Sequence, residues 1–203
     1  MSLTAVPDGE IATIVTSLQM RARPKLRPAP ASNLRLDRWR EPAPERYRTL
    51  FRRVGAPWLW FSRLVMSDAA LTAIVHHPAV ELYAVTDARG IELGMLELDF
   101  REAATCEIAY FGLVPELTGQ GEGRWLMAHT LMLAWRAGIE RVWVHTCTLD
   151  HPKALNFYRA QGFEPYARAV ETFIDPRLAG WLPADEAPQI PLIGPLMVAS
   201  SER

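Results

Sequence analysis

Short stretches in which apolar and polar residues alternate recur along this chain, and this pattern predicts β-strands. They occupy residues 10–20, 34–39, 80–86, 91–100, 105–114, 142–146 and 163–174. Residues 87–90 separate two of these strands, so the strands on either side are expected to form a hairpin. The strand at residues 10–20 precedes a basic, proline-rich stretch, and we expect it to lie outside the main fold.

Apolar residues with helical spacing predict helices over residues 44–54, 67–76 and 124–137. Ser67 is a suitable N-cap for the second helix because its hydroxyl can accept from a free backbone N–H. In the third helix, Leu126, Leu131 and Trp135 are expected to face inward. A fourth helix has Asp150 or His151 as its expected cap and Pro152 near its first turn, and it ends at Gly162.

Composition is that of a one-domain globular protein, with 203 residues of which 49% are hydrophobic. The formal net charge is −1, which gives no general attraction to nucleic acid or to an anionic membrane. No apolar run is long enough to span a bilayer and no export signal is evident, so we expect a cytoplasmic protein. The two cysteines, Cys106 and Cys147, are then expected to be reduced, and no metal site is expected.

The order of these elements suggests three parts. Residues 1–32 contain the first strand and the extended basic linker, and residues 33–174 form the main domain. Residues 175–203 form a proline-rich tail. Trp181 and the apolar residues 190–193 indicate that this tail packs on the domain or on a second subunit.

A glycine-rich loop between the strand at 105–114 and the helix at 124–137 carries the strongest functional signal. Gly119, Gly121 and Gly123 alternate with polar residues just before the helix begins. Glycines allow a ligand to approach the backbone, and a helix N-terminus offers free N–H groups to a phosphate. A Walker A loop is excluded because Arg124 and Trp125 follow Gly123 where Lys and Ser or Thr are needed. The dinucleotide motif G-x-G-x-x-G has no match in either register.

Two sequence blocks resemble the GNAT acyltransferases. Residues 118–123, TGQGEG, are similar to the family's coenzyme A loop R/Q-x-x-G-x-G/A, with Thr118 in place of Arg or Gln. About thirty residues later, residues 151–163 are similar to the family's second signature, N-x-x-A-x-x-L-Y-x-x-x-G-F. There Ala154, Tyr158 and Gly162 are in register, and His151 replaces Asn. The resemblance covers about residues 34–173.

The resemblance implies an α/β (α+β) fold with a mixed, mostly antiparallel central sheet and helices on both faces. The sheet would splay between its fourth and fifth core strands to admit coenzyme A. The implied activity is acetyl transfer from acetyl-CoA, the co-substrate, directly to a primary amine. The residues implied to contact coenzyme A are Phe111, Gly112, Leu113, Val114, Thr118, Gly119, Gln120, Gly121, Glu122, Gly123, Arg124, His151, Ala154 and Tyr158. The backbone from Gln120 to Arg124 would hold the pyrophosphate.

Three side chains are candidates for proton transfer. Tyr158 stands at the family's tyrosine position, which implies that its hydroxyl protonates the leaving thiolate. Glu107 lies on the strand leading to the loop, where family members often carry the general base. His145 is the second choice for that role, because the ordinary pKa of histidine suits base chemistry near neutral pH. Cys147 is expected to be a packing residue.

The acceptor is not identified by the sequence. Trp58 and Trp60, with Phe61, lie in the family's variable acceptor region, where aromatic walls can bind an apolar or cationic amine. The acceptor is expected to be a small-molecule amine or a peptide or protein amine, and a homodimer is compatible with the family. Two alternatives stay open, namely a non-catalytic acyl-CoA-binding regulatory module and an O-acyltransferase.

Overall fold

A single seven-stranded sheet forms the centre of the computed structural model, which describes residues 2–25 and 28–194. The strands are β1 (Glu10–Met20), β2 (Arg35–Trp39), β3 (Val80–Thr86), β4 (Glu92–Asp99), β5 (Thr105–Leu113), β6 (Arg141–Cys147) and β7 (Glu164–Ile174). The helices are α1 (Pro44–Gly55), α2 (Asp68–Val75), α3 (Glu122–Ala134) and α4 (Ala154–Ala160), with short 3₁₀ turns at Ala56–Trp58 and Pro115–Leu117. None of the helices in the described part of the chain is long and apolar enough to cross a membrane.

The strand order is β2-β3-β4-β5-β6-β1-β7, and the β5–β6 pair alone is parallel among the described strands. This is the mixed, mostly antiparallel sheet that the resemblance to the GNAT acyltransferases implies. The prediction that the strand at residues 10–20 lies outside the main fold is wrong, because β1 pairs with β6 on one side and β7 on the other. Its inward residues Leu18 and Met20 are buried in the core, so β1 is an interior strand that closes one half of the sheet.

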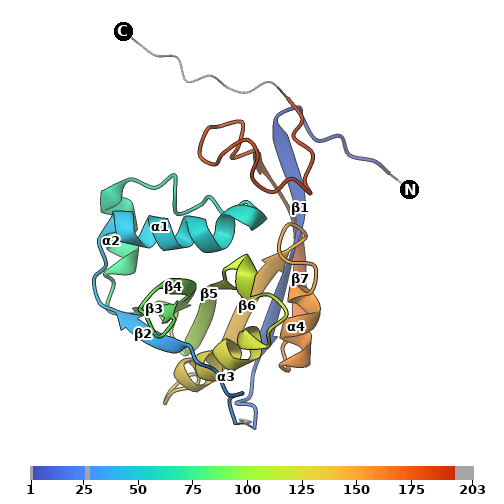
Figure 1. Ribbon diagram of the computed structural model, residues 1–203. Coiled ribbons are helices and arrows are strands. Elements are labelled where there is room, and N and C mark those ends of the chain that lie inside the picture. The colour runs from blue at the N-terminus through green and yellow to red at the C-terminus, as the bar shows by residue number, and fades with distance from the viewer. Residues whose placement is uncertain (1, 26–27, 195–203) are drawn as a thin grey trace.

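Helices cover both faces of the sheet (Figure 1). Alternate residues of β3 show the separation: Leu82 and Ala84 pack with α1 and α2, whereas Tyr83 and Val85 pack in the core that includes α3. The predicted inward residues Leu126 and Leu131 on α3 are buried, and so is Trp135, which is the C-cap because α3 ends at Ala134, earlier than predicted. Two apolar cores therefore hold the sheet from opposite sides.

The sheet opens between β5 and β6, the fourth and fifth strands of the core. Their pairing ends at Glu107 opposite Trp143, and beyond this pair β5 and β6 make no further ladder contacts. The shift in register opposite Glu97 and Leu98 places a bulge at Ala109, the point at which β5 turns away from the ladder. Glu107 therefore lies at the vertex of the opening.

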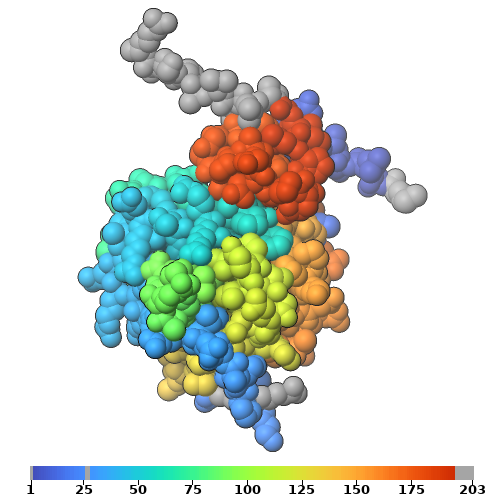
Figure 2. Space-filling view, viewed as in Figure 1, coloured from blue at the N-terminus to red at the C-terminus, as the bar shows by residue number. Residues whose placement is uncertain are grey.

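The C-terminal segment, residues 175–194, folds back over the end of the molecule near α1 (Figures 1 and 2). Arg177 organises it, because its guanidinium pairs with Asp175 at 2.7 Å and donates to the backbone carbonyls of Glu186, Ala187 and Ile190. Leu182 and Ala187 pack in a third apolar cluster with residues from the turn after α1. The part of the predicted tail at residues 195–203 lies outside the described residues.

Candidate functional site

The glycine loop connects β5 to α3 and has the backbone geometry of an anion cradle. Gly119 and Gly121 have φ values of +81° and +86°, a left-handed conformation that other residues rarely adopt. Gly121 is the N-cap of α3. The amides of Gln120 and Arg124 donate to the carbonyls of Leu117 and Gly121. The amides between them, from Gly121 to Gly123, lie at the helix end, where N–H groups lack intrahelical partners.

A cavity of about 230 Å³ runs from this loop along the opening of the sheet, and we call it the loop cavity. Ten of the residues predicted to contact coenzyme A line it, namely Phe111, Gly112, Leu113, Thr118, Gly119, Gly121, Gly123, His151, Ala154 and Tyr158. Trp58 and Trp60, predicted to bind the acceptor, also reach it. Val114, Gln120, Glu122 and Arg124 do not line it. Val114 is buried in the core formed with α1 and α2. The Glu122 carboxylate accepts a hydrogen bond from the Ser32 hydroxyl at 2.6 Å.

A second cavity, of about 300 Å³, lies on the other side of the opening, and we call it the aromatic cavity. Its walls come from the turn after α1, the bulged part of β5, the end of β6, and the neighbouring strands β1 and β7. The aromatic side chains in its lining are Trp58, Trp60, Phe61, Tyr110, Phe111, Tyr158 and Phe173. The two cavities share Trp58, Trp60, Phe111, Ala154 and Tyr158, so they meet at these residues.

Tyr158 lies on α4 at the junction of the cavities. It packs against Phe111, Phe157 and Phe163 with ring centroids 5.6–6.1 Å apart. Its hydroxyl makes no hydrogen bond to another described residue, which leaves it free for a ligand. Burial, assisted by the Asp150 charge, raises the Tyr158 pKa well above its ordinary value, so the phenol is protonated at neutral pH.

The two candidate bases lie together at the vertex of the opening. The Glu107 carboxylate is 3.7 Å from Nδ1 of His145, an ion-pair distance when the imidazole is protonated. His145 lines the aromatic cavity, whereas Glu107 lines a separate depression with Asp99, Arg101 and Trp143. Burial is the main cause that raises the pKa of Glu107 to about 7, and the charges of Asp99 and Glu97 add to it. The carboxyl group therefore titrates near neutral pH, where general bases are effective.

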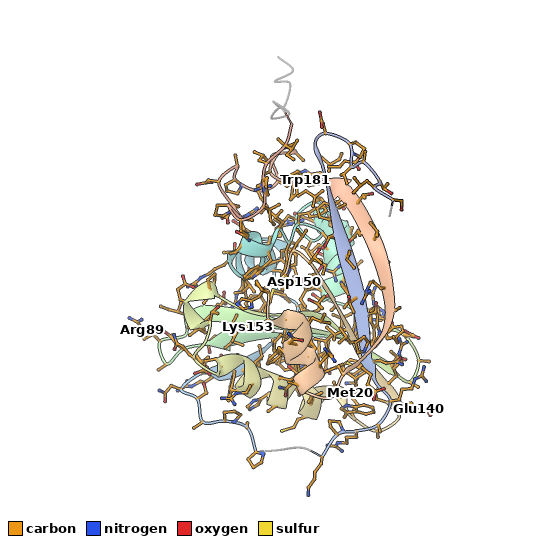
Figure 3. All side chains as sticks on the ribbon, turned by 90° about the vertical axis from the view of Figure 1, so that its right-hand side faces the viewer. Met20, Arg89, Glu140, Asp150, Lys153 and Trp181 are labelled. Atoms are coloured by element: carbon orange, nitrogen blue, oxygen red, sulfur yellow. The ribbon has the colours of Figure 1, made fainter. Side chains whose placement is uncertain are left out.

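Asp150 ties the end of β6 to the turn after α1, and sequence reasoning missed this role. Its carboxylate accepts from the Thr146 hydroxyl at 2.8 Å, the Cys147 amide at 2.9 Å and Nε1 of Trp60 at 3.1 Å. Figure 3 places Asp150 at the centre of the molecule, with Lys153 nearby at the start of α4. The sequence suggested Asp150 or His151 as a helix cap. In the structure, Nδ1 of His151 accepts from the Lys153 amide at 3.1 Å, and Asp150 braces the cavity wall.

Trp60 fits closely against two glycines. A Cβ atom on Gly55 would lie 2.5 Å from the Trp60 Cβ, and one on Gly112 would lie 2.5 Å from Val54 and 3.2 Å from the Trp60 ring. These contacts are shorter than side chains tolerate, so the two glycines allow α1, Trp60 and β5 to approach one another. With its indole N–H held by Asp150, Trp60 is a fixed wall between the two cavities.

A buried ion pair lies beneath the aromatic cavity, and no local pattern in the sequence indicates it. Arg63 donates to Glu97 at 2.5 Å, and Glu97 is fully buried. The Tyr47 hydroxyl donates to the other carboxylate oxygen at 2.6 Å. Arg63 also lies over the Tyr110 ring, and the Tyr110 hydroxyl bonds to Ser62 at 2.6 Å. This network connects α1, the following turn, β4 and β5.

Among the described residues, no three His, Cys, Asp or Glu side chains form a group suited to hold a metal ion. No curated protein matches the chain in sequence. Solved structures match its fold at low identity. A GCN5-related N-acetyltransferase from Sphaerobacter thermophilus aligns with a TM-score of 0.56 and 16% identity over 80% of this chain and 51% of its own length.

Two other structures support the same fold. A functionally unknown conserved protein from Staphylococcus epidermidis aligns with a TM-score of 0.54 and 13% identity, over 82% of this chain and 63% of its own. An aminoglycoside acetyltransferase from an uncultured soil metagenomic sample, solved with sisomicin, aligns with a TM-score of 0.52 and 18% identity, over 64% of this chain and 88% of its own. The chain thus spans less than two thirds of the first two structures, and these likenesses concern the fold.

The sequence profile of the acetyltransferase (GNAT) family matches residues 33–163. This range contains β2 to β6, the glycine loop and α4, the elements that form the loop cavity. The match covers well over half of the chain and agrees with the strand order and the opened sheet. The chain belongs to the GNAT family of acetyltransferases.

Proposed function

We propose that this protein is an N-acetyltransferase that transfers the acetyl group of acetyl-CoA to a primary amine in a ternary complex. The observation that carries the proposal is the junction of the two cavities at Tyr158. One cavity begins at the glycine loop and suits a pyrophosphate-bearing chain. The other opens on the far side of the same tyrosine and offers room for an acceptor. A thioester at the junction would be accessible to both.

The loop cavity fits coenzyme A by its chemistry as well as its position. The helix N-terminus at Gly121 supplies N–H donors and positive dipole potential for the pyrophosphate. Beyond the Glu107–Trp143 pair, β5 and β6 no longer bond each other, so backbone groups near Phe111 and Gly112 are available to the pantetheine amides. The same groups can polarise the thioester carbonyl.

The reaction forms a C–N bond and breaks the C–S bond of the thioester. The amine enters through the aromatic cavity, and His145 is the candidate base in that lining. His145 takes the amine proton, and Glu107, 3.7 Å away, stabilises the resulting imidazolium. Tyr158 donates its proton to the departing thiolate. Each proton transfer is thus performed by a side chain at the opening of the sheet.

Titration of the full chain with acetyl-CoA, followed by an assay of CoA release with primary amines, tests the proposal. ATP and NAD serve as controls for binding. Selective binding of acetyl-CoA together with amine-dependent CoA release is the expected result. Selective binding without release for any amine would instead favour the non-catalytic acyl-CoA-binding module. A folded protein that binds no acyl-CoA would contradict both functions.

A further inference from the structure

The residues that line the aromatic cavity limit the kinds of amine that it can bind. The identity of the acceptor inferred from them rests on the acetyltransferase function proposed above. We propose that the acceptor is an arylalkylamine, a primary amine on a short chain that ends in an uncharged aromatic group. The aromatic group of this amine would lie between two walls of the cavity, one formed by the turn after α1 and the other by β7. It follows from the shape of the cavity, its charges and the way its walls are supported.

The charges of the lining favour a single cation and disfavour an anion. Among the described residues, no lysine or arginine lines the aromatic cavity, so an acceptor carboxylate or phosphate would lack a partner there. Arg63 lies close by, but its guanidinium is committed to Glu97 at 2.5 Å. The acidic residues of the lining are Asp150 and Glu171. Asp150 already accepts three hydrogen bonds, so a polycation would find one free carboxylate in this cavity.

The apolar walls provide a place for a flat ring. Phe61 and Phe173 lie with their ring centroids 5.0 Å apart, and Trp60 and Tyr110 continue the aromatic surface towards Tyr158. Phe61 is partly exposed, so its surface is accessible to a ligand. A volume of about 300 Å³ admits a ring with a short side chain. An amine at the Tyr158 end would thus leave its ring against Phe61 and Phe173.

The C-terminal segment supports this wall from behind. Trp181 stacks on Phe61 with an interplanar angle of 14° and centroids 5.4 Å apart, and it does not itself line the cavity. Figure 3 shows Trp181 at the end of the sheet beside β7. Gln189 donates to the Pro57 carbonyl at 2.8 Å, and Leu182 packs with Leu59. Trp181 is therefore a positioning residue that holds Phe61 in place.

The test compares amines that differ by one group, with acetyl-CoA as the donor and the full chain as the enzyme. Phenethylamine and ethylamine differ by the phenyl ring, whose burial is expected to raise kcat/KM at least about tenfold. Phenethylamine and phenylalanine differ by a carboxylate, and phenylalanine is expected to be a much poorer acceptor. Spermidine and a peptide with a free N-terminus complete the panel. Equal rates for ethylamine and phenethylamine, or preference for spermidine, phenylalanine or the peptide, would overturn the proposal and leave the acetyltransferase function intact.

Substitutions at Phe61 and Trp181 test where the phenyl ring of the acceptor binds. Phe61→Ala is expected to raise KM for phenethylamine about tenfold without a comparable change for ethylamine. Trp181→Ala should raise the same KM with kcat and acetyl-CoA affinity nearly unchanged, and Trp181→Phe should restore it. Val170→Ala is the matched control, because Val170 lies on β7, is 71% exposed and lines neither cavity. An unchanged KM for phenethylamine in Phe61→Ala would contradict the proposed position of the phenyl ring against Phe61.

A binding measurement separates this proposal from the acetyltransferase function. Trp58 and Trp60 line the cavity, so tryptophan fluorescence can follow phenethylamine with or without CoA. If acetyl-CoA does not bind and no amine releases CoA, the proposed function fails. Saturable binding of phenethylamine, weakened in Phe61→Ala, would still support the proposed specificity of the cavity. Absence of saturable phenethylamine binding in both the free and the CoA-bound protein would overturn it.

Discussion

The Glu107 carboxylate lies 3.7 Å from Nδ1 of His145, next to the last pair that joins β5 to β6. A carboxylate at this distance can form an ion pair with a protonated imidazole. Burial and nearby acidic residues raise the pKa of Glu107 to about 7. The vertex of the opening therefore gains negative charge as the pH rises through neutrality. This is the condition that a proton acceptor requires.

The proposed reaction predicts a rising limb in the pH profile of kcat/KM near pH 7, because Glu107 must be deprotonated to stabilise an imidazolium on His145. His145→Gln is expected to lower kcat/KM by about 100-fold, since a general base contributes at least that much. Glu107→Gln should have a smaller effect on kcat/KM and should remove this limb, because the group with a pKa of about 7 is then absent. Rates with both variants across roughly pH 5–9, a window centred on the Glu107 pKa of about 7, measure this. Unchanged rates in both variants would remove the pair from the mechanism.

Glu107 also makes stability depend on pH. Its folded pKa of about 7 exceeds the ordinary value of 4.5, so the folded state binds its proton more tightly than the unfolded state. The stabilisation is fully present below pH 4.5 and is lost as the pH rises through about 7. In Glu107→Gln this loss is absent, so the variant should gain stability relative to the natural protein as pH rises from 5 to 8, roughly the window set by the shift. Urea unfolding at both pH values tests the sign.

Tyr158→Phe removes the hydroxyl at the cavity junction and keeps the ring that packs on Phe111 and Phe163. We expect kcat to fall by about 100-fold or more, the usual loss when an acid that protonates a leaving group is removed. The acetyl-CoA dissociation constant should change little, because the ring is kept and the hydroxyl acts on the departing thiolate rather than on bound acetyl-CoA. Steady-state kinetics and calorimetric titration separate these effects. An unchanged kcat would exclude Tyr158 as the proton donor.

Local signals in the sequence predicted the elements and the loop. Ser67 caps α2 as predicted, with its hydroxyl accepting from Ala70 at 3.2 Å, because capping depends on residues within one turn. The alternating glycines before α3 identified the loop for the same reason. The place of β1 was predicted wrongly. The alternation of apolar and polar residues in β1 predicts a strand and its inward face. It does not predict the neighbours of this strand, because β1 pairs with residues of β6 and β7 that lie more than a hundred positions away in the sequence.

The aromatic cavity was predictable only in part. Trp58 and Trp60 stood out because aromatic residues cluster there in the sequence, but Phe173 and Trp181 reach Phe61 from segments far along the chain. Glu97 and Asp99 occupy alternate positions of the sequence, a pattern typical of an exposed acidic strand face. In the structure Glu97 is buried and paired with Arg63, and Asp99 pairs with Arg101. No local pattern distinguishes a carboxylate with a distant arginine partner from one in water.

A glycine pair offers a controlled test of the loop. Gly119 and Gly138 have φ values of +81° and +84°, and an added Cβ would have no neighbour within 4 Å at either position. Alanine at each position should therefore cost a similar amount of stability, about 1–2 kcal/mol, through backbone strain. Gly119 lines the loop cavity and Gly138 does not. Calorimetric titration should show weaker acetyl-CoA binding in Gly119→Ala only. An equal loss of affinity in Gly138→Ala would mean that general destabilisation causes the effect.

Glu97→Gln tests the buried ion pair beneath the aromatic cavity. The Arg63 guanidinium would lose its charged partner while remaining buried, and this should reduce the free energy of unfolding by about 3 kcal/mol. Glu92→Gln on the same strand is the control. Its pair with Arg46 is at the surface and is expected to contribute less than about 1 kcal/mol. Replacing both Arg63 and Glu97 by methionine should recover much of the stability, because neither charge is then buried alone. Urea unfolding gives all the values, and equal losses for Glu97→Gln and Glu92→Gln would contradict a structural role for the buried pair.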